Sequence, residues 1–427
     1  MKLSLFTSWP DLADHCGSFS LFFLVYCLRK IDRFWTLLES RDAVKTKDMK
    51  PVASYVLALA KRKLILTSSV LETQSIGKLA AVDVIITLNY EPNRIANHNI
   101  QEELVAHHAR IVYAIPSHRE YMRTGYSSEP LLAEAAHQLV YEWETKEPSF
   151  LIDTLNMNND SSVLSKGHSG EMVARLILSS AYHRAVVQES DGESPNFSAG
   201  CSVITFIKQF FSDQHADIVL ESIPDNVSDG EKFKDAFQDS ILRFTHFITM
   251  SSRSNNGDHC PWTSIAWAAF VRGAAIICQS TQDTADFMIP LLDGKDSKIG
   301  ESTISAIIVQ IKNRIQVGPQ NQYLIDAKAA GLFTKETRKF HPYVCLVMEL
   351  GVVLPTHETR NPDETEKPAR GKKQESHKAS VPTQKIKSPL THKSGLAWKK
   401  PSKSQVHARY HVFAYGAPVR STKMSRK

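Results

Sequence analysis

The sequence lacks most of the short motifs that identify an enzyme class. It contains no G-x-x-x-x-G-K-[ST] and no G-x-G-x-x-G pattern, so no loop of the kind that holds nucleotide phosphates is indicated. The G-x-S-x-G turn of many serine hydrolases is also absent. The six cysteines never form a C-x-x-C pair. This spacing argues against a structural zinc site, and sparse cysteines favour a reducing compartment.

Long apolar runs are absent as well. The longest one, SFSLFFLVYCL at residues 18–28, is shorter than the about 20 residues that a membrane-spanning helix requires. Asp11 and Asp14 precede it, which is not typical of a signal peptide. We expect a buried helix or strand here, with a membrane-interacting segment and an incorrect chain start as alternatives. No stable membrane association is expected, and an intracellular location, in the nucleus or cytoplasm, is favoured.

The net charge of +6 hides a strong asymmetry. Residues 356–427 carry 17 Lys and Arg against 5 Asp and Glu, a net charge of +12, so the rest of the chain is mildly acidic at −6. A basic segment of this kind can attract DNA or RNA. It can equally be a solvated linker, because it contains too few apolar residues to form a core.

Composition and periodicity predict a mixed α/β protein with several parts. Apolar residues recur at helical spacing in residues 129–144 and 262–272, whereas β-branched residues at 82–89 predict a strand. Five aromatic and aliphatic residues between 231 and 250 have helical spacing and predict another helix. The expected parts are a poorly defined segment at 1–50, a small α/β region at 51–147, a main body at 160–350 with a helical insertion at about 190–270, a disordered basic linker at 355–406, and a strand with a tail at 407–427. That last strand, RYHVFAY at 409–415, is expected to pair with the strand predicted at 342–350.

The strongest chemical pattern lies in residues 274–314, where three apolar runs are separated by polar turns. Asp286 opens the run DFMIPLL, and Gln310 and Lys312 stand two residues apart in IIVQIKN. Because strand side chains alternate between faces, Gln310 and Lys312 should share one face of a buried strand. A carboxylate and an amide oxygen can hold Mg²⁺, and a lysine can orient water or neutralise charge on phosphorus. The pattern therefore suggests phosphodiester hydrolysis.

These residues resemble the PD-(D/E)XK superfamily of nucleases, which includes restriction endonucleases, in a variant with Q-x-K. The resemblance implies a restriction-endonuclease-like core sheet with flanking helices. It also implies that Asp286 and Gln310 bind the metal, that Lys312 is catalytic, and that Glu171 of GEMVAR is the glutamate of the first helix. The segments SEPLLAEAA, GEMVARLIL, RFTHFI and IP…IIVQIKN also resemble a family of uncharacterised fungal proteins.

Other candidate residues remain open at this point. Asp283 is an alternative to Asp286, and Asp258, His259 and Cys260 form a small cluster of metal-ligand types in one loop. Gln310 is neutral, so this site offers less charge to a divalent ion than a carboxylate would.

Three functions follow from the pattern. The chain is either an Mg²⁺-dependent nuclease acting on DNA or RNA, an inactive nuclease-like protein that binds nucleic acid, or a helical protein-interaction scaffold with an ordinary sheet. The two nuclease-like hypotheses require Asp286 and Lys312 to come together.

Overall fold

The computed structural model describes residues 50–65, 73–88, 90, 95–117, 121–147, 150–151, 153–154, 169–227, 230–249, 262–278, 285–294, 298–312, 325, 327, 332–333, 341–350 and 407–415. The apolar run at 18–28 and the basic linker at 355–406 lie outside these residues. Within the described part, no helix combines the length and the apolar character that crossing a membrane would need.

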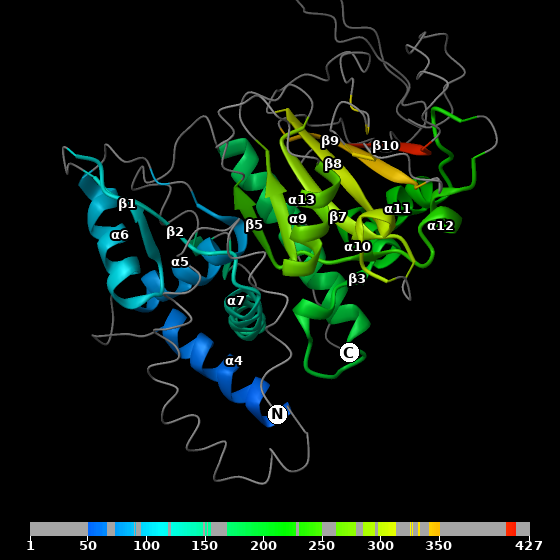
Figure 1. Cartoon of the computed structure of the whole chain (residues 1–427). Coiled ribbons are helices and arrows are strands. Elements are labelled where there is room, and N and C mark those ends of the chain that lie inside the picture. Colours follow the sequence, from blue (N-terminus) through cyan, green and yellow to red (C-terminus); the bar gives the residue numbers. More distant parts are fainter. Residues whose placement is uncertain are drawn as a thin grey trace, which may run out of the picture.

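The protein has a mixed α/β fold in which a helical part lies beside a larger sheet (Figure 1). The helical part consists of α4 (Lys50–Leu64), α5 (Thr73–Ile86), α6 (Ile95–His107) and α7 (Pro130–Glu144), with a small antiparallel pair, β1 (Ile111–Ala114) and β2 (Arg123–Gly125). The prediction of a strand at residues 82–89 is wrong, because residues 82–86 belong to α5. This segment is buried on nearly all sides, and a buried helix and a buried strand have the same apolar composition.

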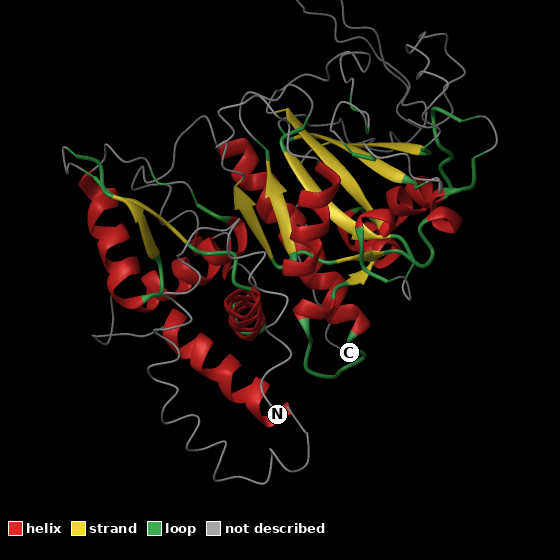
Figure 2. Cartoon of the chain, viewed as in Figure 1, coloured by secondary structure: helices red, strands yellow, loops and turns green. Residues whose placement is uncertain are grey.

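The sheet contains eight strands of mixed direction (Figure 2). Strands β10, β9 and β8 are parallel to one another, and β8 is antiparallel to β7. On the side away from β8, β7 pairs with two strands. Its first residues pair with β6 and its last residues pair with β4. The strands are β3 (Cys201–Ser202), β4 (Ile241–Leu242), β5 (His246–Thr249), β6 (Ala274–Ile277), β7 (Phe287–Leu292), β8 (Ile304–Lys312), β9 (Tyr343–Glu349) and β10 (Arg409–Tyr415).

Strand β10 confirms the pairing expected for residues 409–415. It pairs with β9 in parallel along its whole length, from Arg409 opposite Tyr343 to Tyr415 opposite Glu349. Arg409 also donates hydrogen bonds from Nε and Nη2 to the carboxylate of Asp225, at 2.8 and 3.0 Å. The chain therefore returns to the sheet after residues 351–406.

Helices cover both faces of the sheet. Helix α9 (Ser169–Glu189) and helix α10 (Val203–Phe210) pack on the face that carries Phe287, Val309 and Ile311. Helix α13 (Trp262–Arg272) packs on the opposite face, against Met288 and Ile308. Sheets with both faces covered have strands that are apolar throughout, and β7 is accordingly buried at every position.

The residues between α9 and α13 are not only helical. They form α10, α11 (Asp213–Leu220) and α12 (Phe233–Ala236), but also β3, β4 and β5. The prediction of a helix over residues 231–250 is wrong. Only residues 233–236 are helical, and strands β4 and β5 follow them. The aromatic residues that suggested a helix, including Phe237, Phe244 and Phe247, are buried in the core all the same.

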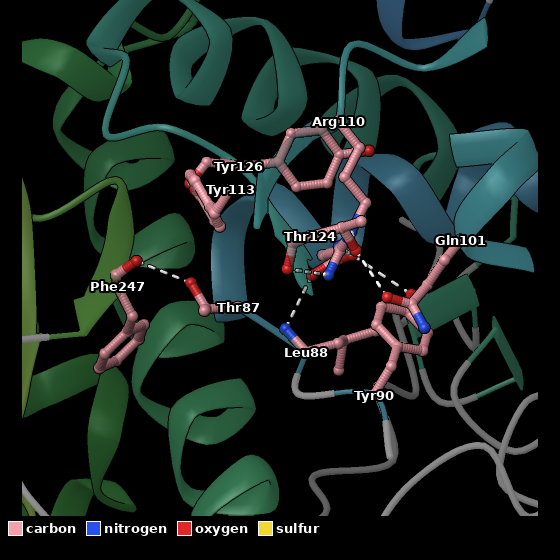
Figure 3. Close-up of polar contacts among 10 residues, drawn as sticks. Thr87, Leu88, Tyr90, Gln101, Arg110, Tyr113, Thr124, Tyr126 and Phe247 are labelled. Carbon is pink, nitrogen blue, oxygen red and sulfur yellow. Dashed lines mark hydrogen bonds and ion pairs between the residues drawn. The ribbon is translucent and has the colours of Figure 1, made fainter. Parts of the chain in front are cut away.

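A buried ion pair connects the elements of the helical part. Asp83 of α5 and Arg110 form an ion pair in which both side chains are 2% exposed. Arg110 Nε donates to Thr124 Oγ1 at 2.8 Å, and its guanidinium lies 4.6 Å from the ring centre of Tyr90 (Figure 3). Beside this cluster, Thr87 Oγ1 donates to the carbonyl of Phe247 at 2.7 Å, which ties the end of α5 to β5.

Substituting Arg110 by Met is expected to destabilise the protein by about 3–5 kcal/mol, because Asp83 would remain buried without its partner. The free energy of unfolding from urea titration measures the effect. Lys61→Met is the matched control, since Lys61 pairs with the half-exposed Glu142 and exposed pairs contribute at most about 1 kcal/mol. Equal losses in the two variants would contradict the assigned role of the buried pair.

Candidate active site

The carboxyl ends of most strands meet at one edge of the sheet. Strand β5 runs parallel to β6, and β8 runs parallel to β9 and β10. Strand β7 runs antiparallel to both β6 and β8, so its first residue, Phe287, lies at that same edge beside Ile277. In open α/β sheets, ligands bind at the edge formed by the carboxyl ends of the strands. Asp286, directly before β7, and Lys312, the last residue of β8, both lie at this edge.

Asp286 terminates the hydrogen-bond ladder between β7 and β8. Its N–H donates to the carbonyl of Val309 at 2.9 Å, and its Oδ2 accepts the N–H of Ile311 at 2.5 Å. The carboxylate thus takes the place of a backbone carbonyl, which satisfies an amide that β7 no longer reaches. This contact holds the carboxylate at the end of the two strands.

Charges from two elements, α9 and β8, act on Asp286. Burial raises the pKa of its carboxyl, while the hydrogen bond from Ile311 lowers it; the nearby charge of Glu171 raises it further, and Lys312 lowers it. Glu171 lies in the first turn of α9, so it reaches the strand edge from the covering helix. Asp286 therefore lies within electrostatic range of both Glu171 and Lys312.

Gln310 approaches this edge from a different side. Val309 and Ile311 belong to the core beneath α9, so strand alternation places Gln310 and Lys312 on the α13 face of β8. Gln310 is 7% exposed, whereas Lys312 at the strand end is half-buried. Gln310 and Lys312 share a face, as the sequence predicts. Glu171 comes from the helix on the other face, and Asp286 lies between them at the ladder end.

Two further charged residues lie near this edge, and the sequence analysis missed both. Glu349 ends β9 directly opposite Lys312 and is 1% exposed. Arg175 lies one turn after Glu171 on α9 and is also 1% exposed. The sequence signal for Glu349 is an acidic residue at the end of an apolar run. The signal for Arg175 is a basic residue four positions after Glu171. The remaining sequence candidates, Asp283 and the 258–260 cluster, lie outside the described residues.

The residues at this edge fit a hard cation such as Mg²⁺. Asp286 and Glu171 are like charges held near each other, and a divalent ion would remove their repulsion. Within the ranges that the structure describes, no three His, Cys, Asp or Glu side chains form a metal-binding group. A cation here would therefore depend on two carboxylates, together with neutral oxygen donors such as the Gln310 amide or water.

Comparison with known families assigns the chain to one of them. The profile of a domain of unknown function, DUF8736, matches residues 69–388. Because this match covers most of the chain, the protein belongs to the DUF8736 family. It includes Glu171, Arg175, Asp286, Gln310 and Lys312. Comparisons with curated proteins and with solved structures gave no match.

Removing the charge of Glu171 is expected to lower the pKa of Asp286. A carboxyl whose pKa is raised in the folded state costs stability as the pH rises from about 4, the unfolded value, through the folded value. The stability of Glu171→Gln relative to the wild type should therefore increase between pH 3 and pH 7. Carboxyl ¹³C NMR titration measures the pKa directly, and urea unfolding at the two pH values measures the stability.

Glu193→Gln is the control for this prediction. Glu193 follows the far end of the 21-residue helix α9, about 30 Å from its first turn at 1.5 Å per residue. The Asp286 titration should be the same in this variant as in the wild type. An Asp286 pKa that does not change in Glu171→Gln would show that the two carboxylates do not interact.

Proposed function

We propose that this DUF8736 protein is a metal-dependent phosphodiesterase that acts on DNA or RNA through a PD-(D/E)XK-like site in a restriction-endonuclease-like core. One observation carries the proposal. Asp286 stands within electrostatic range of both Glu171 and Lys312. All three lie at the edge of the sheet where the carboxyl ends of most strands meet, which we call the strand-end edge. Supporting it, α9 carries the glutamate, β7 follows the aspartate, and β8, antiparallel to β7, carries Q-x-K, in the order that the resemblance implies.

Each residue has a distinct role in this proposal. Asp286 and Glu171 would hold Mg²⁺, with the Gln310 amide as the third protein oxygen donor. The bound ion would supply Lewis-acid stabilisation and a more acidic water. In hydrolysis, a water oxygen bonds to phosphorus as a P–O ester bond breaks, and negative charge grows on the phosphate oxygens. The ammonium of Lys312 neutralises that charge.

The basic segment at 356–427 suits a nucleic-acid substrate. Its net charge of +12 contrasts with the acidic remainder of the chain, so it would bring the polyanion to a body that otherwise repels it. Binding that depends on phosphate neutralisation weakens steeply with salt.

The full-length protein should cleave labelled single- or double-stranded DNA or RNA in the presence of Mg²⁺ or Mn²⁺. Asp286→Asn and Lys312→Met should each reduce the rate by about 100-fold or more, because each removes charge that acts on the reacting phosphate. Gln310→Glu should lower the Mg²⁺ concentration required for half-maximal rate, because a carboxylate attracts a divalent cation more strongly than an amide does. Gel electrophoresis of the products measures all three effects.

Lys298→Met serves as the control, since Lys298 is exposed and precedes β8 at the opposite sheet edge. Its rate should match that of the wild type. Wild-type protein that cuts none of the four substrates with either ion would exclude the nuclease activity.

The neutral Gln310 favours a second function, in which the same edge binds nucleic acid without cleaving it. A weaker metal site would leave binding intact and abolish turnover. Salt-dependent binding of DNA or RNA together with a complete absence of cleavage would select this function. Absence of both binding and cleavage would leave the protein-interaction scaffold.

A further inference from the structure

Arg175 is a buried cation, and two of its three guanidinium nitrogens have no hydrogen-bond partner within the described residues. Its side chain is among the largest that are fully buried, with 1% exposure. Neither Nε nor Nη1 touches solvent or has a hydrogen-bond partner. Buried polar groups are nearly always hydrogen-bonded, and an unpaired buried donor is costly. The guanidinium therefore stands in a position that an acceptor group would complete.

The location of Arg175 connects it to the strand-end edge. Its Cζ lies 5.7 Å from the ring centre of Phe287, the residue that directly follows Asp286. Along α9 it is four residues from Glu171, so both side chains emerge on the same side of the helix. The guanidinium is thus held beside Phe287 at the start of β7, one helical turn from Glu171.

Neighbouring carboxylates raise the pKa of Arg175 but accept no hydrogen bond from its Nε or Nη1. Burial lowers the pKa of its guanidinium to about 10, and the charges of Glu171 and Asp83 raise it, so Arg175 remains protonated at neutral pH. The Asp83 carboxylate already pairs with Arg110 and accepts hydrogen bonds from the N–H of Leu88 and the hydroxyl of Tyr90. Two donor nitrogens of Arg175, Nε and Nη1, therefore remain unsatisfied within the described residues.

An anion with several oxygens suits this arrangement. A guanidinium presents a planar fork of donors that matches carboxylate and phosphate groups, and buried arginines are suited to phosphate recognition. The first turn of α9 lies close by, and helix N-termini also favour anions. A phosphate group bound here would lie beside Arg175, one helical turn from Glu171.

We infer that Arg175 binds a phosphate oxygen of the ligand at the strand-end edge. This inference rests on the proposed function and deepens it, because it assigns a phosphate-positioning residue outside the four that the PD-(D/E)XK resemblance implies. Asp286 and Glu171 would repel a phosphate on their own, whereas a divalent cation between them would remove that repulsion. Phosphate and Mg²⁺ should therefore bind cooperatively.

The test measures binding of inorganic phosphate to the full-length protein by calorimetry, with and without Mg²⁺. The wild type should bind phosphate more tightly with Mg²⁺. Arg175→Met should weaken phosphate binding by about tenfold or more, since a hydrogen bond to a charged group contributes that much or more. Arg175→Lys keeps the charge but loses the fork, so it should bind with intermediate affinity.

Arg184→Met is the matched control on the same helix. Its guanidinium is exposed and donates to the carbonyl of Gln209, away from the strand-end edge. Phosphate affinity should equal that of the wild type. In the absence of phosphate, Arg175→Met should be at least as heat-stable as the wild type, because an unpaired buried charge is replaced by an apolar side chain.

Three outcomes would overturn the inference: no phosphate binding by the wild type, unchanged binding in both Arg175 variants, or cleavage kinetics in which Arg175→Lys leaves KM and kcat unchanged. A failure of the proposed function looks different. If no nucleic acid is cleaved but phosphate binding is lost in Arg175→Met, the anion site stands and the nuclease activity does not.

Discussion

The burial of β8 on both faces is the constraint on which the rest of the structure depends. All its residues except the last are buried, and its neighbours β7 and β9 are buried throughout. Such strands are stable only when helices cover both sides, so α9 and α13 are required on opposite faces. With both faces covered, polar chemistry is confined to the strand ends. The half-buried Lys312 and the turn residue Asp286 mark that boundary.

Helix α9 is the element that joins the two parts of the protein. Ala174, Leu178 and Ala181 face the sheet, while Met172 packs into the core formed by α5 and α7. A helix with cores on two sides has little surface left for charged residues. Glu171 and Arg175 are nevertheless placed in its first two turns, where α9 meets the strand ends. Burial of Arg175 costs desolvation, and charged groups are seldom buried without a partner or a ligand.

Electrostatics at the strand-end edge are balanced rather than dominated by one sign. Asp286, Glu171 and Glu349 supply negative charge, and Lys312 and Arg175 supply positive charge. A site of this composition suits a ligand that brings both a cation and an anion, such as a phosphate with its divalent metal. It suits a purely apolar ligand poorly. The buried Asp83–Arg110 pair is hydrogen-bonded within the helical part, although the charge of Asp83 also acts on Arg175.

The sequence alone determined four strands of the sheet, β7 to β10, and the residue types at their ends. Continuous apolar runs identified β7, β8, β9 and β10, and alternation correctly placed Gln310 and Lys312 on one face. Periodicity gave the wrong element type where residues are buried on several sides. Residues 82–86 are helical rather than a strand, and residues 241–249 contain strands rather than a helix. Only the tertiary structure decided that Glu171, 115 positions before Asp286, reaches the same edge, and that Arg175 and Glu349 stand beside it. The physical reason is that strand direction and helix packing bring distant residues together, and local sequence patterns carry no record of such contacts.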